Sequence, residues 1–297
     1  MSVVFFLIVK SYKWLAVSIV GFLLNLFIVL PFLYPGATNT IDPKPELNYT
    51  ALTLNEAESI RVDPKAPESL TIMMSNVLTS NTNKDSLLNL VMTVEPDLLV
   101  LVEIDDKWIQ SLKTLYSLYP HRKLLPKSDN FGIGIMSKFP LKNIQILHFV
   151  SPRIPSIVAD VELSNNHVHL VATHALPPVS TNWFNKRNLQ FKKIAKHMIS
   201  AKGHKLVIGD FNITRFSPHY EQFITDSKLK NVGHLYGIQP TWPTFSPIFK
   251  IQLDYAFVDT KTKIEHFEVF PSIGSDHLPI FCELLVGFQV KIFSQVK

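Results

Sequence analysis

The chain of 297 residues has one cysteine, Cys282, so it cannot form an intrachain disulfide. Cys282 lies in an apolar run at residues 280–286, where we expect it to be buried and unreactive. The sequence also lacks internal repeats and low-complexity tracts, which excludes a repeat architecture. Its apolar content of 46% is ample for an ordinary packed core.

The chain carries little net charge. It has 29 lysines and arginines against 24 aspartates and glutamates, which gives a formal charge of +5. A protein that wraps nucleic acid through charge would be more basic, whereas this balance is compatible with a phosphate-bearing substrate without requiring one. The length fits one large domain with an appendage.

The N-terminal part of the chain differs in kind from the rest. Residues 14–30 contain no charged side chain, and about 20 apolar residues are enough to cross a bilayer. The run is longer than the apolar core of a signal peptide, about 7–15 residues, and no small-x-small site closes it. We predict a membrane segment at residues 1–35, with an uncleaved transmembrane helix at 14–34. A cleaved signal peptide is the alternative.

Three further segments follow the membrane segment. Residues 36–68 are rich in proline, asparagine, threonine and acids, and we interpret them as a tether. The catalytic domain is expected at 69–287 and a short tail at 288–297. Strand-like runs alternate with helical spacings, which predicts an α/β fold. The expected strands are 70–74, 98–102, 131–136, 157–163, 167–172, 206–208, 256–258 and 278–286, and the expected helices are 85–94 and 184–203.

Short polar motifs follow several of these strands. In open α/β sheets, sites form beyond the carboxyl ends of the strands. Acids, amides and histidines gathered there are the side chains that a metal-assisted phosphoester hydrolase needs. The motifs are Ser75-Asn76-Val77, Val102-Glu103, Thr173-His174, Gly209-Asp210-Phe211-Asn212, Leu253-Asp254-Tyr255 and Gly274-Ser275-Asp276-His277.

This motif set resembles the endonuclease/exonuclease/phosphatase family, which includes deoxyribonuclease I, abasic-site endonucleases, sphingomyelinases and inositol-polyphosphate phosphatases. Gly-Asp-Phe-Asn at 209–212 together with Ser-Asp-His at 275–277 carries the resemblance, which extends over residues 70–286. Asn-Val-Leu-Thr at 76–79, Asp-Asn-Phe-Gly at 129–132 and Pro-Thr-Trp-Pro at 240–243 are similar to a bacterial membrane-anchored subgroup without a settled substrate. The implied fold is a four-layer α/β sandwich, with two packed mixed β-sheets flanked by helices.

The resemblance also implies a metal site. Mg²⁺ prefers oxygen ligands and few protein contacts, and Mn²⁺ is a substitute for it. Glu103 is the expected ligand, supported by Asn76 and Asp276. By the same resemblance, Asp210 aligns or deprotonates the attacking water, and Asn212 holds that water or the phosphate.

The remaining site residues are basic groups and their partner. His277 is expected to lie against the phosphate, oriented by Asp254. His174 resembles a second histidine that donates to a phosphate oxygen in some branches of the family. Arg187 is a candidate substrate contact. Whether Asp210 or the His277–Asp254 pair accepts the proton stays open at this point.

Two other observations bear on these assignments. His167, His169 and His174 lie close together in the sequence, and His-x-His can bind a transition metal, which is a rival interpretation of these residues. Some abasic-site endonucleases carry a carboxylate two residues after the motif asparagine, where this chain has Leu78. The metal site therefore resembles the simpler one of the deoxyribonuclease and phosphodiesterase branches.

The sequence thus predicts a membrane-anchored, Mg²⁺-dependent phosphoesterase. A phosphodiesterase or nuclease is the leading hypothesis. Metal-assisted in-line attack of water on a P–O bond is the expected reaction. The expected partners are a phosphoester substrate, either nucleic acid or a lipid or small phosphodiester, and a membrane; no obligate protein partner is expected. The alternatives are a lipid phosphodiesterase or phosphomonoesterase acting near the bilayer, and a catalytically silent binding module.

The compartment follows from charges and from one acceptor motif. Lys10 and Lys13 precede the apolar run, so the positive-inside rule predicts a cytoplasmic N-terminus and an outer catalytic domain. Asn212-Ile-Thr matches a glycosylation acceptor, and a glycan there would block the proposed site. We therefore expect a bacterial inner membrane, with the domain on the periplasmic face in a Gram-negative cell.

Overall fold

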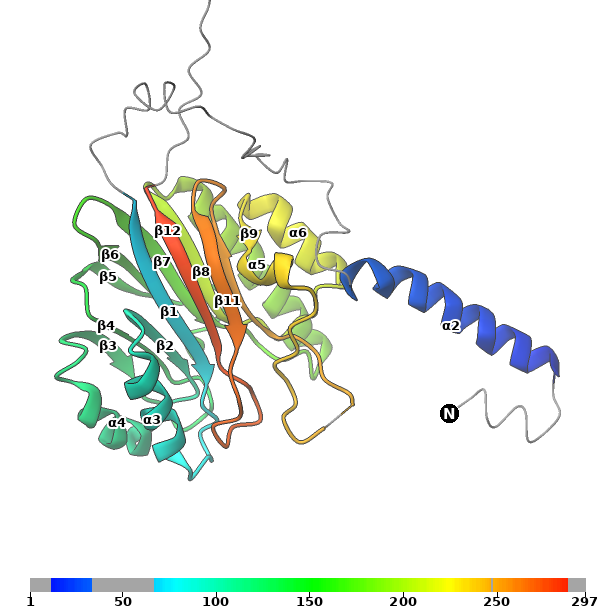
Figure 1. Ribbon diagram of the computed structural model, residues 1–297, viewed down its shortest axis with the longest axis horizontal. Coiled ribbons are helices and arrows are strands. Elements are labelled where there is room, and N and C mark those ends of the chain that lie inside the picture. The colour runs from blue at the N-terminus through cyan, green and yellow to red at the C-terminus, as the bar shows by residue number, and fades with distance from the viewer. Residues whose placement is uncertain (1–11, 34–66, 247, 288–297) are drawn as a thin grey trace, which may run out of the picture. The chain divides into compact units, whose positions relative to one another are not determined.

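The computed structural model describes residues 12–33, 67–246 and 248–287. Figure 1 shows its ribbon. The chain divides into two compact units. One comprises Met1–Glu56 and His234–Ile238, and the other comprises Ala57–Gly233 and Gln239–Lys297. The predicted tether at 36–68 and the tail at 288–297 lie almost entirely outside the described residues, so the structure does not describe them.

The first unit contains helix α2, Tyr12–Leu33, close to the helix expected at 14–34. Its sequence is apolar over most of its length. Among the residues that the structure describes, no helix is both long enough and apolar enough to cross a membrane.

The second unit is built on two six-stranded sheets. In the first sheet, β1 pairs with β2 in parallel and the other pairs are antiparallel, so the sheet is mixed. Its strands, in spatial order, are β11 (Lys263–Val269), β12 (Ile280–Val286), β1 (Glu68–Asn76), β2 (Leu98–Val102), β4 (Ile133–Ser137) and β3 (His121–Leu125).

The second sheet has the same kind of arrangement. Its parallel pair is β7 with β8, and its other pairs are antiparallel. In spatial order the strands are β5 (Leu141–Leu147), β6 (Ser156–Glu162), β7 (His167–His174), β8 (His204–Asp210), β10 (Asp254–Val258) and β9 (Lys230–Asn231).

Helices cover one face of each sheet. Apolar side chains of α3 (Lys84–Val94) and α4 (Asp106–Leu112) share a buried cluster with β1, β2 and β4. Those of α5 (Thr181–Ser200) and α6 (Pro218–Ser227) share another with β6, β7, β8 and β10. Two short 3₁₀ helices complete the described elements, Lys113–Leu115 and Val232–Tyr236.

The other faces of the two sheets pack against each other, as Figure 1 shows. Successive side chains of a strand point to opposite faces, so a strand between a helix layer and a second sheet is buried on both. All five residues of β2 are buried, which explains the continuous apolar run at 98–102. The predicted fold of two packed mixed sheets flanked by helices is confirmed.

The elements that the sequence did not predict are short or exposed. Strands β3, β5 and β11 lie at or near sheet edges, and most of their residues are not buried. Helices α4 and α6 are 7 and 10 residues long. Phe184, expected on the buried face of α5, is 36% exposed, while Arg187 and Gln190 are buried. Local apolar patterns are weak wherever an element has little core to face.

One glycine is required by the close approach of two strands. Gly209 in β8 pairs with Thr173 in β7 and has a φ of 151°. A Cβ atom at this position would lie 1.7 Å from the carbonyl oxygen of Thr173. The contact involves backbone on both sides, so no side-chain movement can relieve it. This explains the glycine of the Gly-Asp-Phe-Asn motif.

We predict that Gly209→Ala lowers the free energy of unfolding by about 3 kcal/mol or more, because β7 and β8 must separate. Denaturant unfolding measures this change. Gly21→Ala is the control, because a Cβ at Gly21 has no neighbouring atom within 4 Å. Equal stability of Gly209→Ala and the parent chain would contradict the close approach.

Candidate active site

The site lies where the ends of five strands meet. Asn76, His174 and Asp210 are the last residues of β1, β7 and β8, and Glu103 directly follows β2. Asp254 begins β10, which runs antiparallel to β8, so it lies beside Asp210. Because the two sheets pack face to face, residues from both reach one place.

Asp210 is the centre of the cluster. Its Oδ2 atom lies 3.2 Å from Nδ2 of Asn76, 3.5 Å from Nε2 of His174 and 3.7 Å from Nε2 of His277. Its Oδ1 atom accepts a hydrogen bond of 2.9 Å from the backbone N–H of Asn212. Burial raises the pKa of Asp210 to about 6, and the neighbouring carboxylate of Asp254 adds to this. Asp210 can therefore exchange a proton close to neutral pH.

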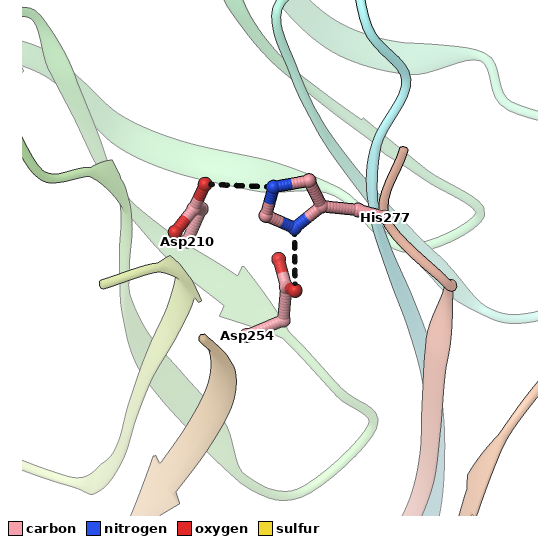
Figure 2. Close-up of side chains that lie close together, drawn as sticks. All are labelled: Asp210, Asp254 and His277. Atoms are coloured by element: carbon pink, nitrogen blue, oxygen red, sulfur yellow. Dashed lines mark hydrogen bonds and ion pairs between the residues drawn. The ribbon is translucent and has the colours of Figure 1, made fainter. Parts of the chain in front are cut away.

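His277 and Asp254 form a buried ion pair, shown in Figure 2. Nδ1 of His277 donates to Oδ2 of Asp254 at 2.8 Å, and Nε2 faces Asp210. Burial alone would lower the pKa of His277, but Asp254 and Asp210 outweigh it and raise the pKa to about 10. The imidazole is therefore a cation and a hydrogen-bond donor at neutral pH.

Ser275 fixes the segment that carries His277. Its hydroxyl donates to the backbone oxygen of Asn76 at 2.7 Å and accepts from the backbone N–H of His277 at 3.1 Å. The strand β1 and the Ser-Asp-His motif are thus joined directly. The sequence marked Ser275 as part of a motif without showing this role.

Glu103 sits at a strained position of the backbone. Its φ is 64°, and its N–H donates to the carbonyl oxygen of Gly132 at 2.7 Å. Nδ2 of Asn76 donates to Oε1 of Glu103 at 2.9 Å. In the described part of the chain, Oε2 of Glu103 is buried and has no hydrogen-bond partner. A buried carboxylate oxygen left in this state is suited to a cation.

Asn76 organises these carboxylates. Its side-chain amide donates to both Glu103 and Asp210, and its Oδ1 atom accepts from the backbone N–H of Leu78 at 3.1 Å. The sequence predicted Asn76 as a supporting metal ligand. The observed contacts instead direct its amide N–H groups, which cannot bind a cation, toward the site.

Asp276 offers a second unpartnered oxygen. Its Oδ2 atom accepts from Nε1 of Trp242 at 3.1 Å, whereas Oδ1 is buried and without a partner among the described residues. Glu103 and Asp276 line the same cleft. Two carboxylates in one cleft, each with a buried oxygen that has no partner, fit the oxygen ligands that a hard divalent cation requires.

Asp210, Asp254 and His277 also form a group that could hold a metal ion, since one potential ligand atom of each lies within 4.8 Å of the others. Their contacts argue for a different use. Nδ1 of His277 already donates to Asp254, and Oδ1 of Asp210 already accepts from the backbone N–H of Asn212, so part of this donor set is occupied within the protein. The unpartnered carboxylate oxygens of Glu103 and Asp276 are the alternative ligands for a cation in this cleft.

His174 pairs with Asp210 across β7 and β8, and Asn212 follows Asp210 by two residues. Nδ2 of Asn212 donates to the carbonyl oxygen of Ala175 at 2.9 Å and lies 3.4 Å from Nε2 of His174. Asn212 has a φ of 49° and lines the cleft. The ring of Phe131 lies 5.3 Å from that of His174. Both predicted residues are therefore part of the cluster.

Arg187 lines the cleft but is largely occupied. It is 4% exposed, and its guanidinium donates to the backbone oxygen of Asn212 at 2.7 Å. It also donates to Oδ1 of Asn188 through Nε and Nη2. Burial lowers its pKa. The observed bonds make Arg187 a support for the turn that carries Asn212, and the substrate contact predicted from the sequence stays a prediction.

The cleft beside these residues has a volume of about 660 Å³. One part of its wall is polar, as described, and the rest is apolar. The sequence did not single out Phe131 and Trp183, which are isolated aromatics outside the polar motifs; the only signal was the Asp-Asn-Phe-Gly phrase at 129–132. The apolar wall consists of Phe131, Pro177, Pro178, Val179, Trp183, Ile213, Trp242, Ile251 and Leu253.

The three histidines of the rival interpretation do not share a site. His169 bonds to Asp160 at 2.7 Å through Nδ1 and lies 2.9 Å from His197 through Nε2. His174 is an odd number of residues further along β7 and faces the cleft. A joint transition-metal site of His167, His169 and His174 is therefore ruled out by strand geometry.

The paired aspartate should control the protonation of His277. We predict that Asp254→Asn lowers the pKa of His277 from about 10 toward or below the ordinary 6.5, because burial then acts with less opposition. In the parent chain the pair stabilises the fold fully below pH 6.5, and this contribution is lost as the pH rises through about 10.

An NMR titration of the histidine ring carbons, without metal, measures this pKa. Asp259→Asn is the matched control, since Asp259 faces His204 at 3.5 Å in another part of the sheet. A pKa of His277 that stays near 10 after Asp254→Asn would contradict the assignment.

Comparisons with known proteins agree with this geometry. A sequence model of the endonuclease/exonuclease/phosphatase family matches residues 75–277, which is more than half of the chain. A comparison with curated proteins gives no match.

Three solved structures show the same fold. A humanized TDP2 of D. rerio has a TM-score of 0.61 and 19% identity, covering 73% of this chain and 98% of that one. The human Nocturnin catalytic domain with bound sulfate has a TM-score of 0.62 and 21% identity, covering 75% of this chain and 95% of that one. Sphingomyelinase C from Streptomyces griseocarneus has a TM-score of 0.56 and 16% identity, covering 73% of this chain and 99% of that one.

At these identities the solved structures establish the fold, and the family match establishes descent. The matched region begins at Ser75 and ends at His277, so it contains every site residue described above. The chain belongs to the endonuclease/exonuclease/phosphatase family.

Proposed function

We propose that the protein is a Mg²⁺-dependent phosphodiesterase that hydrolyses a P–O bond by in-line attack of water. The observation that carries this proposal is the buried Asp210, held between three potential hydrogen-bond donors at the edge of a cleft. Structures of the same fold include hydrolases of phosphodiester bonds, such as sphingomyelinase C. The family and the site therefore point to the same reaction class.

Glu103 and Asp276 would hold the cation through the carboxylate oxygens that lack partners. When bound, Mg²⁺ supplies positive charge that stabilises the negative charge developing on the phosphoryl oxygens. Asn76 fixes the orientation of Glu103 through its amide N–H, which keeps the ligand in place before the ion arrives.

Asp210 would align the water and accept its proton. A pKa of about 6 leaves Asp210 mostly ionised at neutral pH while keeping its affinity for a proton high. His277 is already protonated, so it is suited to donate to a phosphoryl oxygen rather than to act as a base. These two charge states favour Asp210 over the His277–Asp254 pair as the proton acceptor.

The other site residues position these groups. His174 would be a second donor to the phosphoryl group, and its strand β7 flanks β8 on the side opposite to β10, which carries Asp254. Asn212 holds the water or the phosphate, and Arg187 fixes the backbone of Asn212. Each group would lie where charge develops in the transition state. Electrostatic stabilisation of that charge by preorganised groups is usually the largest single contribution to catalysis.

The leading substrate class is nucleic acid, because a D. rerio TDP2 of the same fold is described in complex with a single-stranded DNA product. A lipid phosphodiester is the second candidate. Its support is the apolar wall of the cleft, with Val179 75% exposed at the rim. A binding module without catalysis would have no use for the paired charge states of Asp210 and His277.

We predict that Asp210→Asn lowers turnover at least about 10³-fold, since the amide cannot accept the proton. The assay compares single-stranded DNA, RNA, phospholipid vesicles and a chromogenic phosphodiester, each with Mg²⁺. Asp226→Asn, an exposed carboxylate on α6, is the matched control. Full activity of Asp210→Asn would refute the assigned role, and folded protein inactive on every class would support a binding module.

The cation requirement should depend on Glu103. Removal of divalent ions with a chelator is expected to abolish turnover, and Mg²⁺ to restore it, with Mn²⁺ as a substitute. We predict that Glu103→Gln raises the Mg²⁺ concentration for half-maximal activity about tenfold or more, because a neutral amide is a weaker ligand. Glu95→Gln, an exposed position, is the control. Turnover that is insensitive to both changes would exclude Glu103 as a ligand.

A membrane location is a separate proposal that depends on the sequence alone. The charge-free run at 14–30 and the preceding Lys10 and Lys13 support a domain held outside a bacterial inner membrane, periplasmic in a Gram-negative cell. Protease treatment of spheroplasts tests it. A catalytic domain that is cut only after the cells are lysed would refute the outer location.

A further inference from the structure

The loop at residues 243–250, of which the structure describes all but residue 247, exposes large apolar side chains. Trp242 and Ile251 pair across an isolated β-bridge, and the chain between them forms the loop. Phe245, Ile248 and Phe249 are 78%, 79% and 81% exposed. Burying a side chain of this kind is worth roughly tenfold to a hundredfold in an equilibrium constant, so three exposed on one loop indicate a partner surface.

The base of the loop is fixed to the active-site segment. The backbone N–H of Thr244 donates to the carbonyl oxygen of Asp276 at 2.9 Å. The hydroxyl of Thr244 donates to the carbonyl oxygen of Ser275, also at 2.9 Å. The backbone N–H of Phe249 donates to the hydroxyl of Ser246 at 2.9 Å. The apolar side chains are therefore presented by bonded backbone.

The loop rises from the wall of the catalytic cleft. Trp242 and Ile251, at its two ends, both line that cleft. In Figure 1 the loop between these residues projects past the ends of β11 and β12. Val179, which is 75% exposed, lines the same cleft from the segment between β7 and α5. Exposed apolar side chains thus lie on two separate segments that each contribute residues to the wall of the cleft.

We propose that the 243–250 loop inserts its apolar side chains into the surface of a phospholipid bilayer and so brings the mouth of the catalytic cleft to the membrane. The loop contains no acidic residue and ends at Lys250, whose ammonium group can pair with lipid phosphates. Aromatic and aliphatic side chains next to a cation match the chemistry of the interface between headgroups and acyl chains. This docking surface is independent of the reaction proposed above.

The occupant follows from the shape of the surface. The three apolar side chains are exposed on a loop. A site that binds a segment of another protein would instead need a concave wall. A bilayer accepts protruding side chains without a matched cavity. A protein partner or a second copy of the chain would bury the same residues only by presenting a groove, and the test distinguishes these outcomes.

The buried cysteine makes a local test feasible in the full-length chain. Cys282 is 1% exposed, and burial raises the pKa of its thiol to about 12, so it should not react with a label in the folded protein. Phe245→Cys and Phe249→Cys each carry a polarity-sensitive fluorophore. Met92→Cys on α3 and Ile199→Cys on α5, at side chains 49% and 47% exposed, are matched controls.

Each labelled protein is mixed with vesicles of phosphatidylethanolamine and phosphatidylglycerol. We expect labels at 245 and 249 to shift to shorter emission wavelength and to be quenched by brominated acyl chains, while labels at 92 and 199 stay unchanged. Labels at 245 and 249 that remain in water while the protein sediments with the vesicles would overturn the proposal. A shift that occurs without vesicles and depends on protein concentration would overturn it in favour of self-association.

A second measurement separates docking from catalysis. The double variant Phe245→Ser with Phe249→Ser should lose at least about tenfold in turnover of a vesicle-embedded phosphodiester and keep its turnover of a soluble one. Equal loss on both substrates would contradict docking. Absence of turnover on any substrate would remove the proposed reaction, while the label shifts would still decide the docking surface.

Discussion

The structure depends on one carboxylate buried between two sheets. Asp210 ends a strand of the second sheet, yet its oxygen accepts from Asn76 of the first sheet and faces His277, which precedes β12. A buried negative charge is costly unless donors surround it, so the two sheets must meet in a defined register at this point. The same donors set the charge states on which the chemistry relies. Stability and reactivity are thus coupled through a single side chain.

Much of this arrangement could be predicted from the sequence, and the reason is physical. Strand β2 and the Gly-Asp-Phe-Asn segment leave strong local signals, because full burial requires apolar runs and the close approach at Gly209 requires glycine. Polar residues at strand ends then have to gather at one edge. The edge strands β5 and β11 had no such signal, since exposed side chains are free to be polar.

The roles of individual residues were harder to predict than their location. Arg187 reads as a cation available to a substrate, but the fold turns it toward the backbone of Asn212. Asn76 reads as a ligand, but its N–H groups face the carboxylates. In both cases the residue type indicated that the residue belongs to the site, but the direction of its hydrogen bonds could not be predicted. That direction depends on tertiary packing, which local sequence does not encode.

The polar groups that meet at Asp210 come from strand ends or from residues close to them, whereas most of the apolar wall comes from the connecting segments around 129–132, 177–183 and 242–251. Strand ends are held by ladders of backbone hydrogen bonds and tolerate little change, while connections vary freely. Substrate specificity can therefore change during evolution while the residues at the strand ends stay the same. Family membership, which is detected through residues at the strand ends, therefore indicates the class of reaction. Substrate specificity depends on the connecting loops.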